Sequence, residues 1–385
     1  MANRFILNET SYFGSGSREV LASEVLGRGA NKVFVVTDKD LVKFGVADKV
    51  LTVLKNANIE YALTDDVKAN PTIKNVLDAL ELYKQSNAEL IVAIGGGSVM
   101  DTAKAVGIIA TNPEFSDVRS LEGVAPTKNK CVPIIALPTT AGTAAEVTIN
   151  YVITDEENGK KMVCVDPHDI PVVAIVDAEL MMTMPKGLTA ATGMDALTHA
   201  IEGYITPGAW IMSDMVELQA IELIGKNLKN AVDNGADMVA RENMALAQYI
   251  AGMGFSNVGL GIVHSMAHPL GARFDTPHGV ANAIILPTVM KYNMESASLP
   301  KYRKIAEALG GNTNGLTDHE AGLLACELVQ KLSESVGIPK TLTEIGIPES
   351  ALDQLSVDAF NDVCTGGNPR PTSIEDIKEL YKSLM

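Results

Sequence analysis

The stretch LIVAIGGGSVMDTAKAVGIIATN (90–112) decides the fold of this chain. It opens with an unbroken apolar run, passes through three glycines and Ser98, and continues as a longer apolar and polar pattern that ends at Asn112. An apolar run of this kind is typical of a strand buried on both faces, and the longer pattern is typical of a helix. Strand, glycine turn and helix in this order indicate one repeat of a parallel α/β sheet.

The same alternation extends through residues 1 to about 180. Three further apolar runs predict buried strands: KVFVVTD (32–38), PIIALPT (133–139) and VVAIVD (172–177). Amphipathic stretches that end in Asn or in a cluster of Gly, Asn and Pro predict helices over 41–58, 72–87 and 99–112. Two short runs within NYVITDEENGKKMVCVD (150–166) predict an antiparallel hairpin set on the main sheet.

Beyond about residue 183 the strand signal fades, and long helical patterns follow over 195–205, 213–235, 241–257 and 319–337. The segment MPKGLTAATG (184–193) marks the boundary, because Pro185, Gly187 and Gly193 break the pattern there. We therefore expect an α/β plus all-α protein. An N-terminal, Rossmann-like domain with a parallel sheet covers 1–183, and a helical domain covers 184–385.

Composition narrows the classes of function. The chain has 385 residues, 46% of them hydrophobic and 20% charged, which is the balance of a globular protein with two or three domains. A formal charge of -16 repels phosphate backbones and anionic membranes, so we expect neither nucleic acid nor membrane as a partner. The first residues lack a secretory pattern, which predicts a cytoplasmic protein. The four cysteines form no CxxC pair, which predicts free thiols, three of them buried.

A divalent-metal site is predicted within GMDALTHAIEGY (193–204) and VHSMAHPLGARFDTPHG (263–279), which hold four of the six histidines. Asp195 and His199 are four residues apart and so share one helix face; His264 and His268 repeat that spacing, and His278 follows. A carboxylate and three imidazoles suit Fe(II) or Zn(II). The fifth group is left for proton transfer, and spacing does not decide which residue that is.

Three strand ends favour a bound dinucleotide. Gly95 to Ser98 lie between a strand and a helix, where backbone N–H groups bind phosphate, although an ordinary tight turn has the same sequence. Asp38 follows a strand and is placed either to bond ribose hydroxyls or to cap the next helix. Thr139 to Thr143 form a polar loop at a third strand end, or a loop held by its own hydroxyls.

Five segments of the chain resemble the iron-containing, group III alcohol dehydrogenase family. They are GGGSVMDTAK (95–104), LPTTAGTAAEVT (137–148), ATGMDALTHAIEGY (191–204), GLGIVHSMAHPLGA (259–272) and TPHGVANAIILP (276–287). Because they occur in the family's order from one end to the other, the resemblance covers nearly the whole chain. It implies a dehydroquinate synthase-like fold and reversible hydride transfer between NAD(H) and a small alcohol or aldehyde.

Other segments are similar to the branch of the family that interconverts lactaldehyde and 1,2-propanediol. They include NPEFSDVRSLEG (112–123), TINYVITDEE (148–157), VCVDPHDIP (163–171) and DVCTGGNPR (362–370). The resemblance thus implies NAD-dependent, metal-assisted reduction of lactaldehyde, with 1,3-propanediol or a general short-chain alcohol as the alternative substrate. Two rivals remain. A lyase of the dehydroquinate synthase type needs basic residues near the histidines, where only Arg273 stands, and an interaction protein without catalysis would not bind NADH.

Carried over by position, the resemblance implies a role for each candidate residue. The metal ligands are Asp195, His199, His264 and His278, with Fe(II) expected and Zn(II) able to substitute, and His268 is the proton relay. The NAD-binding residues are Asp38, Asn70, Gly97, Ser98, Thr139, Thr140, Thr148 and Lys161. The substrate-binding residues are Asn150, Phe255 and Cys364. The resemblance also implies a homodimer that involves an N-terminal strand around Phe5 to Asn8.

Overall fold

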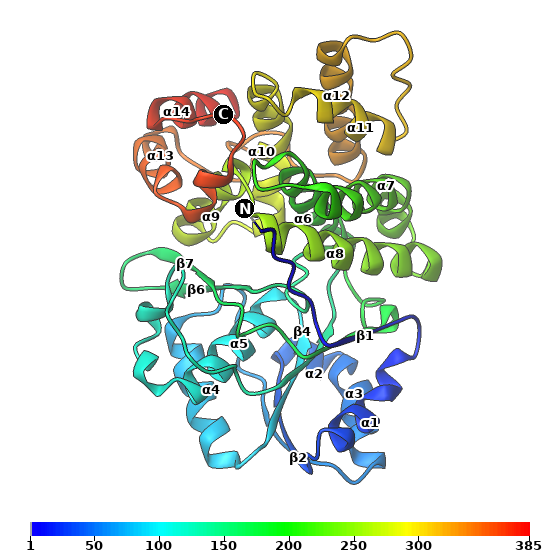
Figure 1. The fold of residues 1–385 in the computed structure, drawn as a ribbon, viewed down its shortest axis with the longest axis vertical. Helices are drawn as coiled ribbons and strands as arrows, with labels where there is room; N and C mark the ends of the chain where they lie inside the picture. Colours follow the sequence, from blue (N-terminus) through cyan, green and yellow to red (C-terminus); the bar gives the residue numbers. More distant parts are fainter. Residues whose placement is uncertain (1) are drawn as a thin grey trace. The chain divides into compact units, whose positions relative to one another are not determined.

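The computed structural model describes residues 2–385, which form two compact units. Unit 1 runs to Thr140 and resumes over Ala144–Thr183, and unit 2 comprises Met184–Met385 together with Ala141–Thr143. Figure 1 colours unit 1 from blue to green and most of unit 2 from green to red. The short segment Ala141–Thr143 belongs to the polar loop that follows the strand over Ile134–Pro138.

Unit 1 is built on a parallel sheet, which has six strands among residues 2–385 (Figure 1). Every pair of neighbouring strands in it is parallel, as the sequence predicted. In spatial order the strands are β1 (Thr10–Phe13), β8 (Val173–Val176), β5 (Ile134–Pro138), β4 (Leu90–Gly95), β2 (Lys32–Val36) and β3 (Glu60–Thr64). The four strands predicted from apolar runs are the four inner ones, because only inner strands are covered on both faces and flanked on both edges.

The two edge strands were not predicted. Strand β1 has no fully buried residue, and β3 buries only Thr64, so neither has an unbroken apolar run. The N-terminal strand around Phe5 to Asn8 stays a prediction for the homodimer; within the single chain, regular pairing starts at Thr10 and joins β1 to β8. Edge strands of this kind are held by backbone hydrogen bonds more than by apolar burial.

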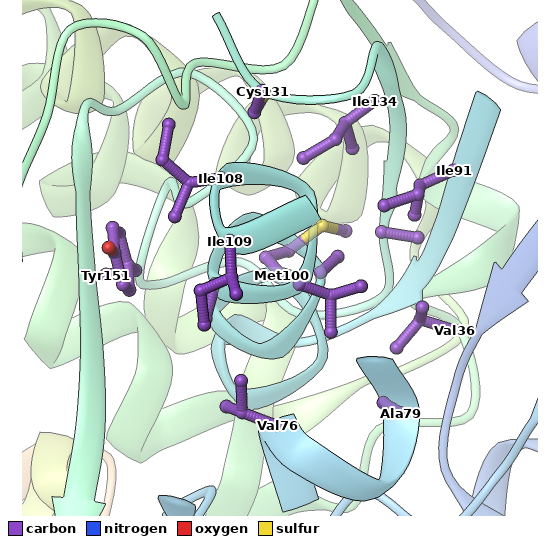
Figure 2. Packing of buried hydrophobic residues seen from close by; sticks show 14 of the residues in the cluster. Val36, Val76, Ala79, Ile91, Met100, Ile108, Ile109, Cys131, Ile134 and Tyr151 are labelled. Atoms are coloured by element: carbon purple, nitrogen blue, oxygen red, sulfur yellow. The ribbon is translucent and has the colours of Figure 1, made fainter. Parts of the chain in front are cut away.

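Alternate residues of the inner strands point to opposite faces of the sheet, and each set packs in a separate apolar core. One core takes Phe34 and Ile91 with α4 (Ile73–Ser86) and α5 (Gly97–Thr111), as Figure 2 shows around Met100, Ile108 and Ile109. The other takes Val33 and Val92 with α1 (Leu21–Gly27) and α3 (Val46–Asn56). Short α2 (Lys39–Lys43) precedes α3, so the helix predicted over 41–58 is interrupted, at Gly45 with a φ of 72°.

The predicted hairpin is present but lies elsewhere than expected. Strands β6 (Asn150–Asp155) and β7 (Lys160–Val165) pair antiparallel and form a two-stranded sheet of their own. Their inward side chains, among them Tyr151 and Cys164, pack in the same core as α5 (Figure 2). The hairpin therefore covers a helix and does not extend the main sheet, because its alternating pattern leaves one apolar face to bury.

Every regular element of unit 2 within the described residues is a helix (Figure 1). The long helices predicted from periodicity are confirmed as α6, α7, α8 and α12. In order the helices are α6 (Lys186–Ile205), α7 (Ile211–Asp233), α8 (Met238–Val258), α9 (Ile262–Phe274), α10 (His278–Asn293), α11 (Leu299–Ala308), α12 (Asp318–Ser335), α13 (Leu352–Phe360) and α14 (Ile374–Ser383).

Glycines do not break α6, contrary to the expectation from the sequence. The helix begins at Lys186 and continues through Gly187 and Gly193. At Gly193 an added Cβ would lie 2.2 Å from Leu228 of α7, so this glycine permits close packing of two helices. The glycines that the sequence pattern assigned to a break thus lie within a continuous helix.

The predicted thiols are confirmed. All four cysteines are free, with Cys131, Cys164 and Cys326 buried and Cys364 partly buried. Among residues 2–385, no single helix is long and apolar enough to cross a membrane; by length and composition alone, only the bent pair of α8 and α9 passes that test.

Candidate active site

Unit 2 brings the predicted metal ligands together from three helices. Asp195 and His199 project from α6, His264 from α9, and His278 is the first residue of α10. One potential ligand atom from each of Asp195, His199 and His264 lies within 4.8 Å of the others, and all three side chains are buried. Nε2 of His278 lies 3.6 Å from Oδ1 of Asp195. The four groups thus converge on one point in the helical unit.

A glycine sets the approach of α10 to α6. An added Cβ on Gly279 would lie 2.2 Å from the backbone oxygen of Ala191 and 3.2 Å from Cβ of Asp195. Backbone oxygen cannot move aside as the end of a side chain can, so no other residue fits at this position. The neighbouring His278 reaches Asp195 because Gly279 lets the helices touch.

Asn282 shows that the convergent atoms are acceptors. Its Nδ2 donates to Oδ1 of Asp195 at 2.7 Å and lies 3.3 Å from Nε2 of His264 and 3.1 Å from Nε2 of His278. An amide N–H₂ group has two hydrogens and can only donate, so it bonds two of these three atoms at a time, and each atom that it bonds presents a lone pair to it. A divalent cation requires the same arrangement, and the donor set of one carboxylate and three imidazoles therefore fits such an ion.

Two of the histidines, His199 and His264, are held in the neutral form that binds metals. Burial lowers the pKa of His199 to about 3, although the nearby Asp195 opposes the shift. Burial also lowers the pKa of His264 well below its usual value. Nδ1 of His199 is buried without a hydrogen-bond partner among the described residues, which is the condition of a ligand atom. The ring of His199 stacks on Phe255 of α8 at 4.2 Å between centroids, which fixes its orientation.

Glu202 supports His264 from α6. Its Oε2 lies 2.6 Å from Nδ1 of His264, and its Oε1 accepts the backbone N–H of Val263 at 2.8 Å. Burial raises the pKa of Glu202 to about 7, a shift that its backbone hydrogen bonds limit. Carboxylates commonly fix the tautomer of a metal-ligating histidine in this way.

His268 belongs to a second group of polar side chains. Its Nδ1 lies 2.7 Å from Oδ2 of Asp362, which precedes the 3₁₀ helix η6 (Val363–Gly367). Burial alone would raise the pKa of Asp362, but the charge and hydrogen bond of His268 bring it down to about 2. Burial and the nearby Asp362 raise the pKa of the Cys364 thiol well above its usual value. The rings of His268 and His278 are stacked with 5.4 Å between their centroids, so the predicted proton relay lies beside a predicted metal ligand.

In unit 1 the predicted phosphate loop and Thr loop follow neighbouring strands. Gly97 and Ser98 open α5 directly after β4, and Thr139 and Thr140 follow β5, which pairs with β4. An added Cβ on Gly96 would lie 3.1 Å from Cγ2 of Thr140, so the two loops are in contact. The carboxyl ends of parallel strands and a helix N-terminus are where such sheets bind dinucleotides.

Three other cofactor candidates, Asp38, Asn70 and Lys161, also lie in unit 1. Oδ1 of Asp38 accepts the backbone N–H of Leu41 at 2.9 Å, so Asp38 caps α2, as one of its two predicted roles required. Burial raises the pKa of Asp38. Nζ of Lys161, on β7, donates to Oδ1 of Asn70 at 2.7 Å. That contact orients both side chains.

Lys104 anchors the remaining candidates of unit 1. It is fully buried on α5, and its Nζ donates to the backbone oxygen of Thr148 at 2.6 Å and of Asn150 at 2.8 Å. Oδ1 of Asp169, also fully buried, lies 4.0 Å from the same nitrogen. Lys104 thus links α5, the helix after the predicted phosphate loop, to the segment that contains Thr148, a predicted cofactor residue, and Asn150, a predicted substrate residue.

Sequence reasoning did not identify four residues that support these groups. They are Glu202, Asn282 and Asp362 in unit 2, and Lys104 in unit 1. Glu202 lies three residues after His199, nearly one helical turn, which was the only local signal. Of the predicted substrate residues, Asn150 lies in unit 1, whereas Phe255 and Cys364 lie in unit 2.

A parallel sheet with a predicted phosphate loop, together with a buried carboxylate and imidazole cluster, is typical of one class of protein: the metal-assisted, dinucleotide-linked oxidoreductases. Comparisons with known proteins agree. Residues 8–178 match the family described as iron-containing alcohol dehydrogenase, and residues 189–385 match the family described as Fe-containing alcohol dehydrogenase, C-terminal. The chain belongs to the iron-containing alcohol dehydrogenase family.

Individual relatives match over their full length. The chain is 56% identical to lactaldehyde reductase of Escherichia coli (strain K12), over 99% of both chains. It is 42% identical to 1,3-propanediol dehydrogenase of Citrobacter freundii, over 98% of this chain and 97% of that protein. A solved structure of 1,3-propanediol oxidoreductase superimposes with a TM-score of 0.97 over the whole of both chains, at 40% identity.

Proposed function

We propose that the protein catalyses the reversible, NAD-dependent and metal-assisted reduction of lactaldehyde to 1,2-propanediol. The observation that carries this proposal is the 56% identity to lactaldehyde reductase over 99% of both chains. Identity to the 1,3-propanediol dehydrogenase is lower, at 42% over a similar length. The comparison therefore favours a three-carbon aldehyde with a hydroxyl group at the adjacent carbon.

The proposed cation is Fe(II), held by Asp195, His199, His264 and His278. Three of these residues offer ligand atoms within 4.8 Å of one another, and the fourth lies 3.6 Å from Asp195. Nitrogen and oxygen donors of this kind also bind Zn(II), so zinc can substitute for iron. When bound, the cation supplies Lewis-acid stabilisation of negative charge on the substrate oxygen, and the dinucleotide supplies or accepts the hydride.

The chain's own residues orient these groups and move the proton. We assign proton transfer to His268, since the nearby Asp362 fixes its Nδ1 and leaves Nε2 for exchange with substrate or water. Phe255 packs against His199 and keeps one face of that ring dry. Phe255, Cys364 and Asn150 are the proposed substrate contacts.

The proposed NAD site uses the carboxyl ends of the strands in unit 1. Gly97 and Ser98 at the N-terminus of α5 are suited to the pyrophosphate, and Asp38 to the adenosine ribose, where a carboxylate disfavours the 2'-phosphate of NADP. The remaining contacts are assigned to Asn70, Thr139, Thr140, Thr148 and Lys161. The assignment of these five residues to the NAD site is supported by their location, since all five lie in unit 1, which contains the parallel sheet.

An NADH oxidation assay tests the proposal. Protein reconstituted with Fe(II) under anaerobic conditions is assayed with lactaldehyde, glycolaldehyde, propanal and 3-hydroxypropanal. We expect the highest kcat/KM with lactaldehyde, and little activity with NADPH. A clear preference for 3-hydroxypropanal would favour the alternative, a 1,3-propanediol dehydrogenase, which the full-length match to the solved 1,3-propanediol oxidoreductase supports.

The metal assignment has its own test. Asp195→Ala and His264→Ala should lose bound metal and activity together, as measured by elemental analysis and turnover of the purified variants. Stoichiometric metal retained in both variants would contradict the assignment of these ligands.

We also propose that the enzyme acts as a homodimer in the cytoplasm. Four free thiols, three of them buried, are typical of proteins in a reducing compartment. Size-exclusion chromatography with light scattering measures the assembly, and a monomer mass near 40.8 kDa would contradict the dimer.

A further inference from the structure

Glu202 is a buried carboxylate that carries none of the proposed ligand roles. It lies on α6, seven residues after Asp195 and three after His199, and only 2% of its surface is exposed. Its two oxygens contact α9, where Oε1 accepts the N–H of Val263 at 2.8 Å and Oε2 lies 2.6 Å from Nδ1 of His264. Helix α6 therefore carries two proposed ligands, Asp195 and His199, and through Glu202 it also contacts the ring of a third, His264.

The partners of Glu202 determine which nitrogen of His264 carries the proton. The backbone N–H of Val263 can only donate, and the ionised carboxylate can only accept. Nδ1 of His264 must then donate to Oε2, which leaves Nε2 as the acceptor. On the opposite side of the ring, Nδ2 of Asn282, which can only donate, lies 3.3 Å from Nε2. A hydrogen bond from Asn282 to Nε2 requires the same tautomer.

The carboxylate has no room to turn away. An added Cβ on Gly261 would lie 2.8 Å from Oε1 of Glu202, so the backbone of α9's first turn presses on this oxygen. The N-terminus of α9 presents the positive end of its helix dipole, and the N–H of Val263 donates to the carboxylate. Both effects stabilise the ionised carboxylate and oppose burial, which raises the pKa of Glu202 to about 7.

We propose that Glu202 is a positioning residue that sets the affinity of the site for its divalent cation, by holding His264 with the proton on Nδ1 and the lone pair of Nε2 toward Asp195. This inference rests on the proposed ligand role of His264. Carboxylates that bond to metal-ligating histidines typically contribute about 10- to 100-fold to metal affinity.

The substitution Glu202→Gln separates positioning from packing, because glutamine has nearly the same shape. Its single carbonyl oxygen can accept from Val263, and its N–H₂ group then faces Nδ1 of His264. Nδ1 must in that case accept, and the proton moves to Nε2, where it opposes a cation. If the side-chain amide in Glu202→Gln were turned the other way, its N–H₂ group would face the N–H of Val263. Two donors would then oppose each other, so this orientation is disfavoured.

The experiment measures binding of Zn²⁺ to full-length, metal-free protein by competition with a chromophoric chelator. A matched control is Glu217→Gln, which changes another fully buried glutamate, on α7, that packs against Gly203 and Gly254 and contacts none of the proposed ligands. We expect the Kd for Zn²⁺ to rise about 10- to 100-fold in Glu202→Gln and to stay within twofold in the control. Two-bond ¹H–¹⁵N correlations of histidine-labelled protein should show the proton of His264 on Nδ1 in the wild type and on Nε2 in Glu202→Gln.

The outcomes distinguish this inference from the proposed function. If wild type and Glu202→Gln bind Zn²⁺ equally tightly, the positioning role is wrong and the metal site stands. If both Gln variants weaken binding to the same degree, the effect is one of packing, and the positioning role is again wrong. If His264→Ala binds Zn²⁺ as tightly as wild type, His264 is not a ligand and the proposed site itself is wrong.

Discussion

Nδ1 of His268 lies 2.7 Å from Oδ2 of Asp362, although the two residues are 94 positions apart in the chain. The contact joins α9 to the segment just before η6. It holds the edge of the His268 ring, while a face of the same ring stacks on His278. His268 is therefore held by one neighbour on each side, as a group that transfers a proton at a fixed point must be.

Replacing Asp362 should reduce turnover without removing the metal. In Asp362→Asn we expect kcat to fall roughly 10²-fold, the lower end of the contribution of a positioned acid or base, while metal content stays at the wild-type value. The double variant Asp362→Asn/His268→Ala should be no slower than His268→Ala alone, because both residues serve one proton. Wild-type turnover of His268→Ala across the pH range would contradict the relay.

Gly279→Ala should remove tight metal binding while the helices still form. The added methyl group would lie 2.2 Å from the backbone oxygen of Ala191, so α10 must shift away from α6 and take His278 with it. The measurement is metal content after dialysis, together with circular dichroism. Gly187→Ala is the control, since an added Cβ there meets no atom within 4 Å, and it should keep its metal. Retained metal in Gly279→Ala would show that α10 tolerates the shift.

The stability of the protein should fall with rising pH because of Glu217. Burial raises the pKa of its carboxyl well above the usual value, so the folded protein keeps a proton that the unfolded chain releases above about pH 4.5. The free energy of unfolding then decreases by up to about 1.4 kcal/mol per pH unit, until the folded pKa is reached.

In Glu217→Gln this decrease should become smaller, because the other buried carboxyls such as Glu202 still contribute, and urea unfolding at pH 5, 6, 7 and 8 would measure the difference. Glu222→Gln, at a partly exposed position on the same helix, should retain the wild-type slope. Equal slopes in the wild type and Glu217→Gln would mean that another group carries the pH dependence.

Lys104→Met should weaken both the fold and NADH binding. The variant removes the donor for the backbone oxygens of Thr148 and Asn150, and each buried acceptor left without a partner typically costs about 1–3 kcal/mol. We expect the Kd for NADH, from fluorescence titration, to rise about tenfold because the segment of Thr148 loses its anchor. In Lys104→Met/Asp169→Leu the stability should partly return while the NADH affinity does not. Full recovery of both would contradict an anchoring role.

The sequence predicted the inner strands and the long helices because their signals are local. Unbroken apolar runs marked β2, β4, β5 and β8, and helical periodicity marked α6, α7, α8 and α12. Strands β1 and β3 escaped prediction because each lies at an edge of the sheet and buries little. Gly193 was misjudged for a related reason: its role depends on Leu228, a residue of another helix that the local pattern does not contain.

The proposed ligands were found from spacing and resemblance, but their supports were not. Asp195 and His199 are one helical turn apart, so the sequence displays their relationship directly. Glu202 contacts His264, which is 62 positions away in the sequence, and Asp362 contacts His268, which is 94 positions away. Contacts of this kind arise from helix packing, and a single sequence contains no signal for the partner.

Asn282 determines how three helices of the cluster are tied together. Its amide nitrogen donates to Asp195 of α6 at 2.7 Å and lies within 3.3 Å of Nε2 of His264 on α9 and of His278 on α10. A substitution of Asn282 would therefore act on all three helices at once, through a single neutral side chain and without removing any proposed ligand.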